Sequence, residues 1–122
     1  MPYHVWLRGK AAKDYWGNDS VYVQFSGTVD ATGAPVYRIG TTSGAAVTIE
    51  DGTNAGLAGW GWNDTAFGAV ADPLTFEVSG PQTIRVQVRE DGLSIDQIVL
   101  SAGKYLTTSP GATKNDTTIL QK

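Results

Sequence analysis

Short runs of alternating apolar and polar residues, separated by glycine-rich turns, constrain the fold of this chain more than any other feature. In one such run Ile84, Val86 and Val88 alternate with polar residues. Successive side chains of a β-strand point to opposite faces, so a period of two is typical of a strand that packs one face on a core. The same pattern predicts strands over 3–8, 21–26, 36–40, 47–50, 74–78, 83–89 and 94–101. Only 9–15 has the composition of a brief helix, and it is short for a stable one.

Turn signals between these runs complete an all-β pattern. Aspartate or serine followed by glycine recurs at 51–52, 79–80 and 91–92, and the chain has 15 glycines and 5 prolines. These residue types favour tight turns. Short strands at this spacing, without a helical period, predict an antiparallel β-sandwich or barrel. The 122 residues suit one domain. We expect it over 1–106, with a polar segment, 107–122, packed on it or trailing from it.

Composition excludes several classes of function. The formal net charge is −3 and there is no run of lysine or arginine, which argues against a nucleic-acid partner. No apolar stretch approaches the length of a membrane span. The chain has no cysteine and one histidine, His4, which excludes thiol catalysis and a multi-histidine metal site. Catalytic mechanisms that use only carboxylates are not excluded by composition. However, no carboxylate pair is predicted to converge on a cleft, so we expect that the protein is not an enzyme.

Two tryptophans, Trp60 and Trp62, stand two residues apart between glycines and precede Asn63 and Asp64. In an extended strand both indoles would lie on one face and form an apolar platform edged by hydrogen-bonding groups, which suits a sugar ring. The glycines equally permit a loop, in which one indole caps the core and the other meets the ligand. We then expect Trp62 to be exposed, because polar residues follow it directly. The competing interpretation is two core tryptophans.

A second aromatic segment precedes the predicted strand 21–26. Tyr15 and Trp16 are adjacent, and a polar run starts at Asn18. Exposed aromatics on a loop indicate a contact surface, here with rings that stack on a sugar, while Asn18 and Asp19 bind its hydroxyls. Alternatively, Trp16 folds back over the end of the sandwich and the polar residues form a turn.

The charged stretch 88–98 supplies two further candidates. Glu90 is a candidate for binding sugar hydroxyls. Asp96 shares a face with Ile98 and Leu100 on a period of two, and a carboxylate on an apolar face needs a partner. That partner is an arginine, a set of backbone amides or a calcium ion.

Four stretches together resemble a known family: 3–11, 18–25, 59–62 and 89–100. They resemble bacterial carbohydrate-binding modules of the galactose-binding-domain-like superfamily, of the family 6 and family 35 types. The resemblance implies a jelly roll of two antiparallel sheets with ligand loops at one end, in a secreted protein that is extracellular or periplasmic. It also implies that Trp60 or Trp62 stacks on the sugar and that Asp96 binds a structural calcium. Ser94 takes the place of a ligand-contacting asparagine of better-known members.

Such modules usually begin with one or two additional strands, and this chain resembles them from what would be the third strand onward. We therefore expect a calcium site that is incomplete or absent. We also expect a sheet edge that is exposed, covered by the polar C-terminal segment, or paired with a second copy in a homo-oligomer.

The predicted function is non-catalytic binding of a poly- or oligosaccharide by aromatic stacking and hydrogen bonds. The alternative is a structural or self-assembly module whose aromatics lie in the core or at a subunit interface. The candidate ligand contacts are Tyr15, Trp16, Asn18, Trp60, Trp62, Asn63, Asp64, Glu90 and Ser94.

Overall fold

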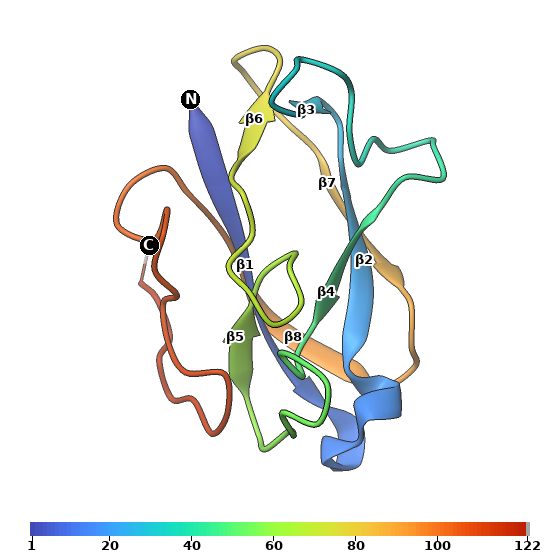
Figure 1. The fold of residues 1–122 in the computed structure, drawn as a ribbon, viewed down its shortest axis with the longest axis vertical. Helices are drawn as coiled ribbons and strands as arrows, with labels where there is room; N and C mark the ends of the chain where they lie inside the picture. The colour runs from blue at the N-terminus through green and yellow to red at the C-terminus, as the bar shows by residue number, and fades with distance from the viewer. Residues whose placement is uncertain (122) are drawn as a thin grey trace.

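The computed structural model describes residues 1–121, whose regular structure consists of β-strands and two single turns of 3₁₀-helix (Figure 1). In chain order the elements are β1 (Pro2–Ala11), η1 (Ala12–Asp14), η2 (Trp16–Asn18), β2 (Ser20–Phe25), β3 (Thr28–Val29), β4 (Ala45–Thr48), β5 (Gly61–Asn63), β6 (Leu74–Phe76), β7 (Ile84–Val88) and β8 (Leu93–Ser101). Within this part of the chain, no helix is both long and apolar enough to cross a membrane.

Strand β1 organises the larger sheet because it has hydrogen-bonded neighbours on both sides. β8 pairs with it antiparallel along nearly its whole length. On the other side, β6 pairs with the start of β1 and β5 with its end, while β3 pairs with β6. The register shifts between Arg8 and Gly9, which leaves Asp96 of β8 without a directly opposite residue. This β-bulge accommodates the extra residue in β8.

The smaller sheet has the order β4-β2-β7, and all its pairs are antiparallel. Val21, Val23 and Phe25 of β2 are buried on its inner face. They pack against Val5 and Leu7 of β1 in one core cluster that spans both sheets. The molecule is therefore an antiparallel β-sandwich.

The outer face of β1 is also buried, because the C-terminal segment lies over it. Figure 1 shows this segment, coloured orange to red, beside β1 and β5. Trp6 donates a hydrogen bond from Nε1 to the Tyr105 carbonyl at 2.7 Å, and the His4 Nδ1 lies 2.9 Å from the Leu106 carbonyl. Further along, the backbone of Asp116 donates to the Trp60 carbonyl at 2.8 Å. The segment forms a third layer on this side of the sandwich.

The predicted all-β class is confirmed, whereas the jelly-roll connectivity stays a prediction. Six of the predicted strands correspond to β1, β2, β4, β6, β7 and β8. The run 36–40 forms no strand: Tyr37 has a φ of 51°, which interrupts extended backbone, and Arg38 makes an isolated bridge to Phe25. The predicted brief helix at 9–15 is instead the end of β1 followed by η1.

Candidate functional site

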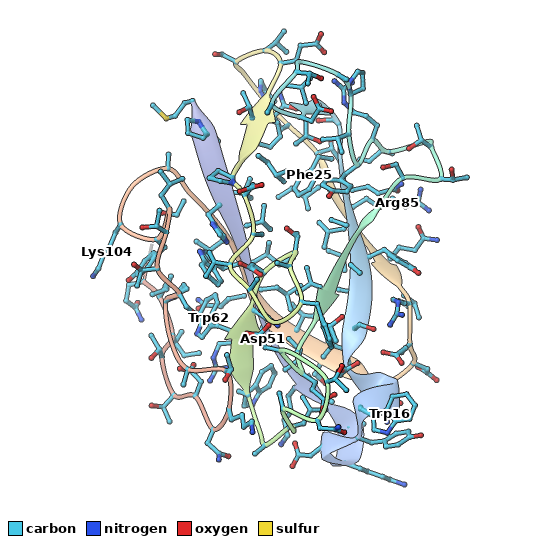
Figure 2. All side chains as sticks on the ribbon, in the orientation of Figure 1. Trp16, Phe25, Asp51, Trp62, Arg85 and Lys104 are labelled. Atoms are coloured by element: carbon cyan, nitrogen blue, oxygen red, sulfur yellow. The ribbon has the colours of Figure 1, made fainter. Side chains whose placement is uncertain are left out.

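A surface hollow of about 380 Å³ lies at the end of the smaller sheet, where η2 meets the start of β2. Two aromatic side chains on its border face solvent, since Trp16 is 63% and Phe67 55% exposed. Figure 2 shows Trp16 beside the η1–η2 turn, at the edge of the molecule. The other lining residues are Asp19, Ala46, Thr48, Glu50, Arg89 and Glu90. The hollow thus combines an exposed aromatic rim with carboxylates and a guanidinium.

Antiparallel pairing brings these carboxylates together from three separate strands. Asp19 immediately precedes β2, Glu50 follows the end of β4, and Glu90 follows the end of β7. Because β4 and β7 both run antiparallel to β2, their ends lie beside its beginning. The site is therefore a product of sheet topology.

Asp19 is buried, and its pKa is raised from 3.8 to about 6. Burial is the largest cause, because desolvation penalises the charged carboxylate. A side-chain hydrogen bond with Glu90 and the negative charges of Glu90 and Glu50 raise the pKa further, against a hydrogen bond from the Glu50 amide that lowers it. That amide lies 3.3 Å from the Asp19 Oδ2. Asp19 is consequently a hydrogen donor to Glu90 under mildly acidic conditions.

Glu90 shows the opposite balance. Burial alone would raise its pKa, but hydrogen bonds from Ser20 and Asp19 and the charge of Arg89 together lower the pKa. The Arg89 Nη1 donates to the Ser20 Oγ at 2.8 Å and lies 3.5 Å from the Glu90 Oε1. Glu90 is therefore held as a carboxylate acceptor next to a guanidinium donor.

A strained loop presents the aromatic rim. Lys13 and Asp14 have φ values of 61° and 48°, a left-handed region that non-glycine residues adopt uncommonly. The Asp14 Oδ1 accepts the backbone N–H of Gly59 at 2.9 Å, which ties this loop to the turn before β5. Beyond it, the ring centroids of Tyr15 and Trp16 lie 5.3 Å apart, and Tyr15 is 50% exposed.

Among the predicted contacts, Trp16 and Glu90 both line the hollow, and Tyr15 packs beside Trp16. Asn18 lies in η2, but its Nδ2 donates to the Ala12 carbonyl at 3.1 Å, a bond that stabilises the turn itself. Ser94 is exposed on β8, and the hollow is not lined by it.

The second tryptophan of the glycine-tryptophan run is buried beneath the C-terminal segment. Trp62 is 1% exposed, so the prediction that it is the exposed member of the pair is wrong. Its Nε1 donates to the Thr118 carbonyl at 3.2 Å, and its backbone N–H donates to the Ala112 carbonyl at 3.0 Å. Trp60 is half-buried, with the Arg8 guanidinium 5.0 Å from the ring centroid. Neither indole forms an open platform.

Asn63 and Asp64 are also engaged inside the protein. The Asn63 Nδ2 donates to the Thr48 carbonyl. The Asp64 Oδ2 lies 2.8 Å from the His4 Nε2 and accepts the backbone N–H of Ala71 at 2.9 Å. A hollow of about 220 Å³ borders these residues, but both side chains are buried and bonded, so we assign them a structural role.

Asp96 is paired with an arginine, one of the three partners considered for it. Its Oδ2 accepts a hydrogen bond from the Arg8 Nη1 at 2.6 Å. A calcium ion at this oxygen would face the guanidinium charge of Arg8, so the observed pairing favours the arginine. Calcium binding by Asp96 stays a prediction.

The candidate contacts predicted from the sequence did not include Glu50, Phe67 and Arg89, whereas Asp19 was predicted to bind sugar hydroxyls together with Asn18. One signal was present in the chain: acidic residues stand within two positions of the ends of three strands that pair with one another. Phe67 lies in the β5–β6 connection, where no local pattern marks it.

No protein-family model, curated protein or solved structure matches this chain. The interpretation of the hollow therefore depends on its own geometry.

Proposed function

We propose that this chain is a non-catalytic carbohydrate-binding module and that its sugar site is the hollow bordered by Trp16. The observation that carries the proposal is an exposed tryptophan next to a carboxylate and a guanidinium that are already held in place. An indole face stacks on the C–H face of a sugar ring, while Glu90 accepts from hydroxyls and Arg89 donates to them. A few placed polar groups beside an apolar surface are typical of small-ligand sites.

A second, larger hollow is less suitable as the sugar site. It has a volume of about 740 Å³ and lies beside β3 and β6, where Asp30 and Asp72 are among its lining residues. Its aromatic residue is the half-buried Tyr37. Volume alone does not bind a sugar, and this hollow offers no exposed ring on which one could stack.

The acidic pair in the smaller hollow favours binding over hydrolysis. Glycoside hydrolysis uses two carboxyl groups roughly 5–10 Å apart on either side of the scissile bond. Asp19 is instead buried and lies against Glu90, whose charge helps to raise its pKa, so the two groups are not arranged on either side of a bound sugar. The single histidine, His4, is 1% exposed and bonded to Asp64, which keeps it from a substrate.

Affinity electrophoresis in gels that contain soluble plant and bacterial polysaccharides tests the proposal. The unaltered chain should be retarded by at least one polysaccharide, and Trp16→Ala should weaken retardation at least about tenfold, equivalent to ~1.4 kcal/mol. Glu90→Gln should weaken it as well, because the amide is a poorer acceptor for hydroxyls. Thermal melts of each variant establish that it remains folded.

Trp60→Ala is the matched control, because it removes a tryptophan outside the hollow. Retardation that survives Trp16→Ala but is lost in folded Trp60→Ala would place the sugar at Trp60 instead. The absence of retardation by every polysaccharide would contradict the proposed function itself.

A further inference from the structure

The inner face of β7 is apolar but only partly covered. Val86 lies directly opposite the buried Val23, and Val88 opposite the buried Val21. Directly opposite residues of an antiparallel pair share a face, so both valines point toward the other sheet. Nevertheless Val86 is 39% and Val88 70% exposed. Both valines therefore remain accessible to solvent although they lie on the core side of their sheet.

The neighbouring edge of β8 is unpaired. β8 pairs with β1 on one side, and over residues 1–121 no backbone hydrogen bond joins its other side to another segment. The strand is 9 residues long and contains neither lysine nor proline, the residues that commonly protect an exposed edge. A hollow of about 350 Å³ between Ile84 of β7 and Leu100 of β8 lies on the same flank. The sandwich is therefore open between β7 and β8.

A β-strand with one apolar face would fit this flank. Backbone groups on the free edge of β8 can pair with it, and its apolar side chains would cover the two valines of β7. Strand addition to an exposed sheet edge is an established mode of association.

We propose that a second copy of this chain supplies that strand, through antiparallel pairing of β8 with β8 about a two-fold axis. The inward side chains of β8 are Leu93, Ile95, Ile98 and Leu100, which all pack on the core from one face. Their identities and spacing read the same from either end of the strand, so β8 is complementary to itself. With Leu93 opposite the second copy's Leu100, Ile95 lies opposite Ile98, and each of these four inward side chains meets an apolar partner.

This register also suits the polar positions. Ser94 lies opposite the second copy's Val99, and Asp96 lies opposite Gln97, so no like charges face each other. The bulge at Asp96 lies at the two-fold axis, next to the same bulge in the second copy. A two-fold interface in which residue i meets j and j meets i closes after two subunits, which makes the assembly a dimer. The inference does not depend on the proposed sugar site.

Light scattering after size-exclusion chromatography tests the dimer with the chain at about 100 μM, a concentration that populates complexes of micromolar affinity. The chain should have twice its monomer mass. Val88→Glu should halve that mass, because the buried interface would then contain an unpaired carboxylate. Val70→Glu is the matched control: Val70 is 62% exposed in the β5–β6 connection, and this variant should remain dimeric. A monomeric parent chain, or a dimeric Val88→Glu variant, would overturn the proposal.

The register has its own test, which the absence of cysteine from the chain makes simple. The double variant Ser94→Cys/Val99→Cys should form intermolecular disulfides under mild oxidation, since the two positions lie opposite each other across the axis. Ser94→Cys alone should not, because its two copies would be separated by about five residues, or roughly 16 Å along the strands. Equal cross-linking of the single and double variants would contradict the register.

Discussion

At the scale of single residues, the candidate sugar site depends on how one proton is held between two carboxyl groups. Burial raises the pKa of Asp19 to about 6, while hydrogen bonds and the nearby guanidinium lower that of Glu90. Asp19 therefore binds a proton that its neighbour does not. Through this division Glu90 keeps its charge as an acceptor, although it lies against another acid.

The raised pKa of Asp19 predicts a pH dependence of stability. Between about pH 4 and pH 6 the folded chain binds this proton more tightly than the unfolded chain does, so this group's contribution to the free energy of unfolding falls as pH rises. The variant Asp19→Asn has no carboxyl group at this position that can gain or lose a proton in this pH range. The stability advantage of the parent chain over this variant should therefore shrink between pH 4 and pH 7, by on the order of 2 kcal/mol. Urea unfolding at several pH values measures the difference.

Asp72→Asn serves as the control, because Asp72 is an exposed carboxyl outside the hollow. Its stability difference from the parent chain should vary little over the same range. A difference between parent and Asp19→Asn that grows toward neutral pH would contradict the assigned cause.

At the scale of elements, the C-terminal segment and β5 depend on each other. A Cβ atom built on Gly61 would clash with the carbonyl oxygen of Thr113, whereas no atom lies within 4 Å of one built on Gly103. The glycine before Trp62 is therefore required for close approach of the backbone of the C-terminal segment. It is not evidence for a flexible ligand loop.

Gly61→Ala should consequently destabilise the fold by about 1–3 kcal/mol, a typical cost of overpacking. Gly103→Ala should be neutral or stabilising by up to about 1 kcal/mol, because it restricts the unfolded chain without a clash. Denaturant unfolding gives both values. If the two variants are equally stable, the close packing of the C-terminal segment on β5 is wrong.

At the scale of the whole molecule, one arginine joins three parts of the fold. Arg8 of β1 donates to the Asp96 Oδ2 of β8 at 2.6 Å and to the Asp116 Oδ2 of the C-terminal segment at 2.9 Å. It also donates to the Asp116 carbonyl at 2.6 Å. Arg8 and Asp116 are both buried, so loss of the guanidinium would leave a buried carboxylate unpaired.

Arg8→Leu should therefore lower the free energy of unfolding by about 3–5 kcal/mol. Arg8→Lys should restore little of it, because one ammonium cannot reproduce the planar set of donors. Arg85→Leu is the matched control, since Arg85 is exposed on β7 (Figure 2), and its effect should stay within about 0.5 kcal/mol. Similar effects of Arg8→Leu and Arg85→Leu in thermal and urea unfolding would contradict the role assigned to Arg8.

The amino-acid sequence by itself determined the fold class and most of the strands. A period of two is a local property of extended backbone, so Val21, Val23 and Phe25 indicated β2 without knowledge of any partner. β5 has three residues and begins at a glycine, which is too little for a pattern to show. Trp16 and Glu90, which line one hollow, were both candidates from the sequence, because adjacent aromatics and dense charge are local signals.

Only the tertiary structure decided which faces are buried and which polar groups meet. Trp62 became a core residue because a segment some fifty positions away covers it, with its Nε1 bonded to Thr118. Asp96 is paired with Arg8, which lies on a strand distant in the sequence. Asp19, Glu50 and Glu90 lie close together because antiparallel pairing aligns the ends of three strands. Burial and pairing depend on contacts between residues far apart in the chain, whereas alternation depends only on neighbours. For that physical reason the sequence predicted the strands, and the structure was needed to locate the site.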